Sequence, residues 1–219
     1  LVALMGLARG PMLDVAAGWA GLQVAHATVH PAFWIYFAGA FVCGVAAWAK
    51  FRWMPHLGVL ACAAALAATL TLDAPAPVAL LFLVMIGFIA FIVSVYSLGY
   101  MAHAHRQGWY WFFLLLTFAS LAGIVSTPDM AAMYGYWELM TFASYFLVVH
   151  EANRVAFDAG FKYYLMCAGG ALLMLPGMLL LGNGGLGLAD VRIQSALLSP
   201  HVLNMAALLC LVGFGVKAG

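Results

Sequence analysis

Seven long apolar segments, separated by short polar stretches, dominate the pattern of this chain. Each comes close to the roughly 20 residues that an α-helix needs to cross the hydrocarbon core of a bilayer. The apolar residues run continuously instead of alternating with polar ones, which favours helices over the strands of a membrane barrel. We therefore expect an all-α, polytopic transmembrane helix bundle with about seven spans. The expected spans cover residues 33–49, 57–72, 78–101, 109–126, 130–149, 162–181 and 201 onward.

The two ends of the chain depart from this pattern. Residues 1–31 mix short apolar stretches with glycine and histidine, which predicts a partial helix or an interfacial segment. The chain begins without methionine and stops inside an apolar run, so we expect it to be part of a longer polypeptide.

Composition narrows the class of protein. Hydrophobic residues make up 67% of the chain and charged residues 7%, whereas a soluble domain carries about 25% charged residues. Lipid must therefore cover most of the surface, and a net charge of +1 gives no footprint for nucleic acid. Each of the four cysteines lies inside an apolar segment and none forms a CxxC pair, so they are interpreted as packing residues. The histidines lie at span ends or in loops, which disfavours haem ligation, and we expect neither a cofactor nor a metal site.

The basic residues of the loops predict the orientation. Three connections, at residues 50–56, 102–108 and 150–162, together hold five lysines and arginines, whereas the alternate loops hold only Arg192. Cytoplasmic loops of membrane proteins carry the excess of lysine and arginine. We therefore expect these three loops on the cytoplasmic side.

Two charged residues break the apolar rule. Glu138 lies within the fifth expected span, about 13 Å along the helix from Asp129 at 1.5 Å per residue, and Lys217 lies within the seventh. A charge in mid-membrane costs about 2.5–3.5 kcal/mol, so such residues face the protein interior, a water-filled cavity or an opposite charge. Proton transfer between Glu138 and Lys217 is the functional interpretation, and a static buried ion pair is the alternative. We expect Gly213 and Gly215 to break the helix next to Lys217, as in membrane ion sites.

Three residues share the helix face of Glu138, namely Tyr134, Thr141 and Tyr145. They are auxiliary candidates, because their hydroxyl groups are able to hold water or to bond the carboxylate.

Three further titratable residues lie near span ends. Lys162 opens the sixth span, where it is either an interfacial lysine or a proton relay that tunes Glu138. Asp129 fits an N-cap of the fifth span better than a proton carrier. His150, at the other end of that span, is able to titrate near neutral pH.

Several stretches between residues 78 and 219 carry a resemblance to a known family. They are Tyr96-Ser97-Leu98-Gly99-Tyr100-Met101, the run that starts at Phe112-Phe113, Trp137-Glu138 with Ser144-Tyr145 and Gly160-Phe161-Lys162, and Gly213-Phe214-Gly215-Val216-Lys217-Ala218-Gly219. These motifs resemble the proton-conducting, antiporter-like membrane subunits of respiratory complex I, of energy-converting hydrogenases and of Mrp cation/proton antiporters. The resemblance implies that Glu138 pairs with Lys217 in a broken seventh helix, and that a second, inverted helix unit follows the present chain. It also divides the chain into an N-terminal segment with two spans, residues 1–77, and the start of the proton-conducting domain, residues 78–219.

The expected function follows from the pair and the resemblance together. We expect an ion-translocating subunit for H⁺, or also Na⁺, in the cytoplasmic membrane of a prokaryote. It would carry no catalytic residues and would work beside other membrane subunits and iron–sulfur, hydrogenase or dehydrogenase subunits of a redox-driven complex. A cation/proton antiporter without a redox partner and a structural scaffold subunit are the alternatives.

Overall fold

The computed structural model describes residues 29–49, 53–72, 76–103, 106–182 and 187–218. Residues 1–28, and with them most of the expectation for 1–31, lie outside the described residues. The same holds for Lys50 and Arg52 of the first basic loop.

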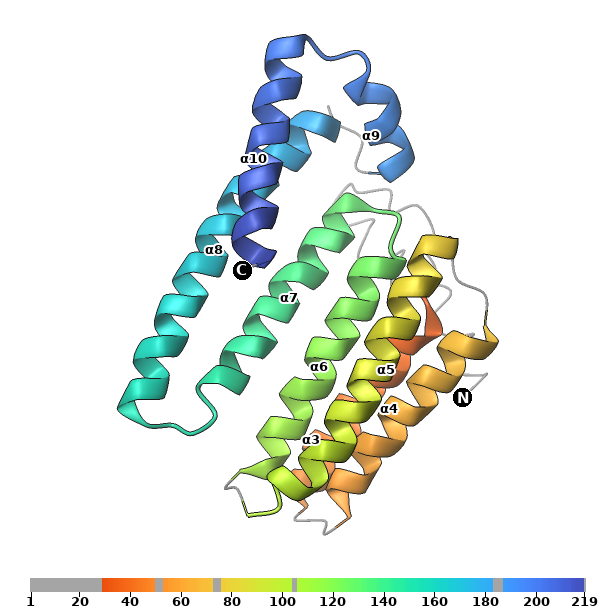
Figure 1. Cartoon of the computed structure of the whole chain (residues 1–219), viewed down its shortest axis with the longest axis vertical. Coiled ribbons are helices and arrows are strands. Elements are labelled where there is room, and N and C mark those ends of the chain that lie inside the picture. The colour runs from red at the N-terminus through yellow and green to blue at the C-terminus, as the bar shows by residue number, and fades with distance from the viewer. Residues whose placement is uncertain (1–28, 50–52, 73–75, 104–105, 183–186, 219) are drawn as a thin grey trace.

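The described residues form α-helices that pack into an elongated bundle (Figure 1). The prediction of an all-α bundle is confirmed, and each expected span corresponds to one long helix, whose ends lie within a few residues of the prediction except at the start of the sixth span. Six of the described helices are long and apolar enough to cross a membrane. The exception among the long helices is α7, because its glutamate and tyrosines lower its mean hydropathy. The helices are α3 Pro31–Trp48, α4 Met54–Thr71, α5 Pro77–Tyr100, α6 Gln107–Ser126, α7 Met130–Val148, α8 Arg154–Gly182, α9 Leu188–Ser195 and α10 Pro200–Ala218.

Helix α8 begins eight positions before the expected start of the sixth span. Asn153 caps it, since its side-chain oxygen accepts a hydrogen bond from the amide of Ala156 at 2.7 Å. The first turns of α8 therefore include Asp158 and Lys162, which the apolar pattern had assigned to a loop or a span boundary. Short α9 was also missed, because the connection after α8 was expected to be a loop.

Helices α3 to α7 enclose the larger core. Trp111 of α6 lies at its centre with no exposed surface, and a Cβ on Gly58 of α4 would overlap its ring. Only glycine allows this contact between α4 and α6. The exposed faces carry large apolar side chains, as expected for helices in contact with lipid.

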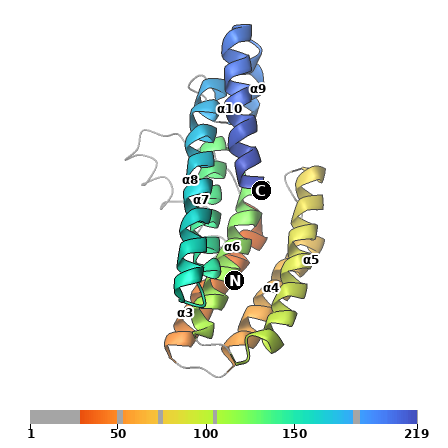
Figure 2. The same ribbon diagram turned by 60° about the vertical axis from the view of Figure 1, so that its left-hand side comes forward.

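Helices α8 and α10 run antiparallel and lie at the opposite edge of the molecule from α4 and α5 (Figures 1 and 2). Glycines allow their backbones to approach closely. A Cβ on Gly213 would lie 2.7 Å from the amide of Met174 and 2.8 Å from the carbonyl of Gly170, and one on Gly177 would lie 3.0 Å from the amide of Cys210.

This packing corrects the expectation for Gly213 and Gly215. Helix α10 is continuous through both residues to Ala218, so no break occurs at these glycines within the described residues. Gly213 serves helix contact instead, whereas a Cβ on Gly215 would meet nothing within 4 Å. Of the two neighbouring glycines in α8, Gly170 lies at the contact and Gly169 has open space around it.

The helix ends that flank the three basic loops lie at one end of the molecule. The last turns of α3, α5 and α7 and the first turns of α4, α6 and α8 all lie at the lower end in Figure 1. This arrangement is the one that the alternation of basic loops requires.

Candidate functional site

Helix α7 presents Glu138 from a well-defined start. The Asp129 side chain accepts a hydrogen bond from the amide of Ala131 at 3.1 Å and so caps the helix. Asp129 also pairs through its backbone with Gly187, which follows α8. The prediction that Asp129 is an N-cap is confirmed, and the cap fixes where along the chain the turns of α7 begin.

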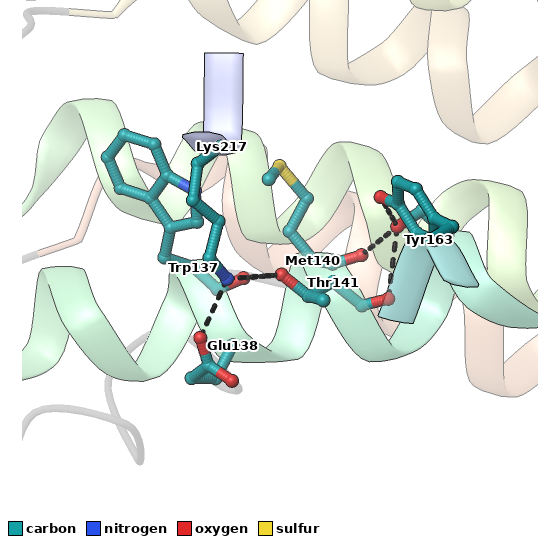
Figure 3. A network of polar contacts seen from close by, with 7 residues as sticks. Trp137, Glu138, Met140, Thr141, Tyr163 and Lys217 are labelled. Atoms are coloured by element: carbon teal, nitrogen blue, oxygen red, sulfur yellow. Dashed lines mark hydrogen bonds and ion pairs between the residues drawn. The ribbon is translucent and has the colours of Figure 1, made fainter. Parts of the chain in front are cut away.

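Glu138 and Lys217 meet across the space between α7 and α10. The Lys217 Nζ atom lies 2.7 Å from Glu138 Oε1 (Figure 3). The two side chains differ in exposure, at 1% for Lys217 and 36% for Glu138. Lys217 is thus enclosed by the protein, whereas the carboxylate is the accessible member of the pair.

Thr141 supplies a second acceptor for the ammonium group. Lys217 Nζ also donates to Thr141 Oγ1 at 2.7 Å, and Thr141 Oγ1 donates to the carbonyl of Trp137 at 3.0 Å. The hydroxyl proton is therefore directed along the helix, and the free lone pairs of the oxygen face Lys217. Thr141, which is 1% exposed, thus bonds the lysine and not the carboxylate.

Ser144 repeats this geometry one turn further along α7. Its hydroxyl oxygen lies 2.8 Å from the Met140 carbonyl, 3.0 Å from the Thr141 carbonyl and 2.7 Å from the hydroxyl of Tyr163 on α8. The serine has one proton for three oxygen neighbours, and the Ser144 and Tyr163 hydroxyls share a hydrogen bond in which either is able to donate. Helix α7 therefore presents a row of side-chain oxygens, those of Glu138, Thr141 and Ser144, to polar groups on α10 and α8. Figure 3 shows Glu138 and Thr141 directed toward Lys217.

Apolar side chains surround the polar row. The Trp137 ring packs against Phe214 of α10, with centroids 5.1 Å apart. A methionine cluster, Met130, Met174 and Met178, lies beside Trp137 and extends the apolar wall. Low polarity around the pair strengthens its electrostatic attraction and penalises either charge if it is left alone.

The remaining predicted residues lie outside the contacts of the ion pair. Tyr134 packs on the methionine cluster, and the Tyr145 ring lies 5.6 Å from that of Tyr164. His150 follows α7, with its ring 5.7 Å from that of Tyr110. Lys162 lies on the exposed side of α8.

Sequence reasoning did not single out Ser144 and Tyr163 as site residues. Ser144 falls at helical spacing from Glu138 and Thr141, a signal that could have marked it. Nothing in the sequence marks Tyr163 over Tyr164, because the contact depends on which side of α8 faces α7.

Known proteins share parts of this sequence. Residues 66–113 match the family described as NADH-Ubiquinone oxidoreductase (complex I), chain 5 N-terminus. Over 62% of this chain the sequence is 31% identical to Hydrogenase-4 component B of Escherichia coli (strain K12), of which the match covers 20%. Over 59% of the chain it is 32% identical to Na(+)/H(+) antiporter subunit A1 of Staphylococcus aureus (strain JH9), of which it covers 15%. The chain therefore spans about a fifth or less of these relatives.

A solved structure shares the fold. The membrane-bound sulfane sulfur reductase (MBS), an archaeal respiratory membrane complex, contains a chain that superimposes with a TM-score of 0.74 at 16% identity. The match covers 84% of this chain and 43% of that one. Parts of the chain are thus similar in sequence to complex I chain 5, to Hydrogenase-4 component B and to Na(+)/H(+) antiporter subunit A1, and its fold is that of a chain of the archaeal complex.

Proposed function

We propose that this chain forms the proton-handling part of an ion-translocating membrane subunit, with Glu138 and Lys217 as the groups that exchange protons. The observation that carries the proposal is the 2.7 Å ion pair between an enclosed lysine and an accessible glutamate on two helices of a membrane bundle. Ionisable residues within membrane spans are expensive and rare, and where they occur they commonly mark ion or proton pathways.

The unequal exposure of the two side chains suggests an order of events. Lys217, at 1% exposure, has little access to anything but its two acceptors, whereas Glu138 is 36% exposed. A proton would therefore enter or leave through Glu138, and Lys217 would set the affinity of the carboxylate for it. While the ammonium is docked, it favours the charged carboxylate, and when it moves away, the carboxylate takes up a proton more readily.

The names of two relatives support a redox energy source and redox partners. Hydrogenase-4 component B and the chain of the archaeal respiratory complex belong by name to redox assemblies. We infer that this chain works beside other membrane subunits of such an assembly, with iron–sulfur or hydrogenase-type partners, in the cytoplasmic membrane and with its basic loops in the cytoplasm. The chain itself would translocate H⁺ and would not catalyse the redox reaction.

A second function is supported by the similarity to Na(+)/H(+) antiporter subunit A1. In that case the same pair would couple H⁺ to Na⁺ without a redox partner. Proton movement that follows a Na⁺ gradient in the absence of electron donor would favour this function over the first.

The proposal is tested in the native membrane assembly, reconstituted in vesicles that report internal pH. We expect Glu138→Gln and Lys217→Ala each to lower proton translocation more than tenfold. Glu151→Gln is the matched control, because Glu151 is exposed and lies in the loop after α7. The double variant Glu138→Gln/Lys217→Met removes both charges and so avoids an unpaired buried charge, which otherwise costs about 3–5 kcal/mol of stability.

A scaffold role predicts the opposite result. If the single and the double variants translocate protons at the wild-type rate, the pair is structural and the proposal is wrong. If the single variants lose activity together with assembly, their loss is an effect on folding, and the double variant, which leaves no unpaired charge, then decides: a wild-type rate in it would refute the proposal.

A further inference from the structure

The position of Lys217 depends on how α8 and α10 sit against α7. Close glycine contacts fix helix α10 to α8. Val216 of α10 packs directly on Gly170 of α8, since a Cβ added to Gly170 would lie only 3.0 Å from the Cβ of Val216. Lys217 follows Val216 in the chain. The lysine therefore moves with α8, although it bonds to α7.

The Ser144–Tyr163 hydrogen bond joins α7 to α8 directly, at 2.7 Å. On α7, Ser144 lies about two turns from Glu138, which is about 9 Å at 1.5 Å per residue. On α8, Tyr163 lies about two turns, or about 10 Å, from Gly170. The two spacings match, so the contacts among α7, α8 and α10 form a closed path.

This closed path has four segments. It runs along α7 from Glu138 to Ser144, crosses to Tyr163, follows α8 to Gly170, and returns through α10 and Lys217 to Glu138. A slide of α8 along α7 by one turn would break both polar contacts at once. With the Ser144–Tyr163 bond in place, the reach of Lys217 to its acceptors is set by rigid helices.

We propose that Tyr163 is a positioning residue, which acts through Ser144 to hold the α8–α10 pair at the height where Lys217 meets Glu138 and Thr141. This inference rests on the proposed function of the pair. Tyr163 touches neither charged group. Its hydroxyl lies within hydrogen-bond distance of Ser144 Oγ, which also contacts two backbone carbonyls of α7, so the bond ties the phenol to a serine that is held against its own helix.

The chain offers a matched control at the next position. Tyr164 has the same side chain, is 40% exposed and contacts the ring of Tyr145. Tyr164→Phe removes a hydroxyl from α8 without touching Ser144. Ser120→Ala is the corresponding control for serine, since Ser120 of α6 bonds the carbonyl of Leu116 in the same local way, at 2.8 Å.

The experiment uses the native membrane assembly reconstituted in vesicles. It measures the rate of proton translocation, divided by the amount of assembled complex. We expect Tyr163→Phe and Ser144→Ala each to lower the rate about fivefold, the factor that about 1 kcal/mol, the worth of one hydrogen bond, produces. The double variant should be no worse than either single one, because both remove the same bond. Ser144→Thr keeps a hydroxyl and should retain most of the rate, and both controls should stay near wild type.

A spectroscopic measurement separates positioning from stability. The carboxylate band of Glu138, identified by its loss in Glu138→Gln, should shift in Tyr163→Phe and stay unchanged in Tyr164→Phe. A bond that serves stability alone would lower the melting temperature and leave this band and the rate unchanged.

The outcomes separate this inference from the proposed function. If Tyr163→Phe and Ser144→Ala translocate normally while Glu138→Gln does not, the positioning role is wrong and the function of the pair stands. If Glu138→Gln is also active, the proposed function fails first. Equal losses in Tyr163→Phe and Tyr164→Phe would also overturn the inference.

Discussion

Replacing Thr141 with valine isolates one contact of the buried ammonium group. Valine has nearly the shape of threonine, so the packing of this 1% exposed side chain is kept. The change removes the 2.7 Å bond from Lys217 and the 3.0 Å bond to the Trp137 carbonyl. The second loss is minor, because that carbonyl already takes part in the helix and such local side-chain bonds slightly destabilise helices.

The size of the effect follows from the remaining partners. A hydrogen bond to a charged group contributes about 1.5–3 kcal/mol, which is roughly 10- to 150-fold in an equilibrium constant. Glu138 still holds the ammonium at 2.7 Å, so we expect the lower end of this range. The equilibrium constant for docking Lys217 should fall about tenfold, and proton translocation should fall by up to that factor.

The assay is proton translocation in vesicles, with assembly and melting temperature measured on the same samples. Thr141→Ser keeps the acceptor and should retain most of the rate. Thr117→Val is the matched control, because Thr117 of α6 bonds the carbonyl of Phe113 at 2.8 Å and lies on a different helix from the ion pair. A wild-type rate in Thr141→Val, or an equal loss in Thr117→Val, would refute the reasoning.

Three further predictions concern packing, pH and an exposed lysine. Gly213→Ala should lower the melting temperature and the translocation rate, since its Cβ would meet backbone atoms of α8 at 2.7–2.8 Å. Gly215→Ala should leave the melting temperature unchanged or raise it, because nothing lies within 4 Å, and equal effects of the two variants would contradict this account. Burial lowers the pKa of His30, whose neutral ring accepts a hydrogen bond from the amide of Ala32. The stability that the neutral ring contributes should therefore be complete above about pH 6.5 and lost as the pH falls, which the melting temperatures of wild type and His30→Asn would show. Lys162→Ala should lower translocation by less than about threefold, because Lys162 is exposed on α8, whereas a loss as large as that in Lys217→Ala would support a relay role.

Local chemistry made some features of this protein predictable. The high cost of a charge in the membrane marked Glu138 and Lys217 without any structure. Asp129 was recognisable as an N-cap because the capping preference depends only on the neighbouring amides.

Other features escaped the sequence, for identifiable reasons. The start of α8 was placed too late, because an apolar pattern cannot follow a helix into its polar first turns. A break was expected at Gly213 and Gly215, but close packing against α8 gives Gly213 a different role. Local patterns cannot distinguish a glycine that bends a helix from one that admits a neighbouring helix.

The sequence by itself determined the class of the protein, because the length and polarity of its segments leave lipid as the only suitable environment for most of its surface. It also determined which two charges need an explanation. Only the tertiary structure decided how those charges are satisfied. The contacts of Lys217 with Glu138 and Thr141, and of Tyr163 with Ser144, depend on the rotation and height of α8 and α10 against α7. These quantities are set by packing between segments far apart in the chain, and local sequence patterns carry no information about them.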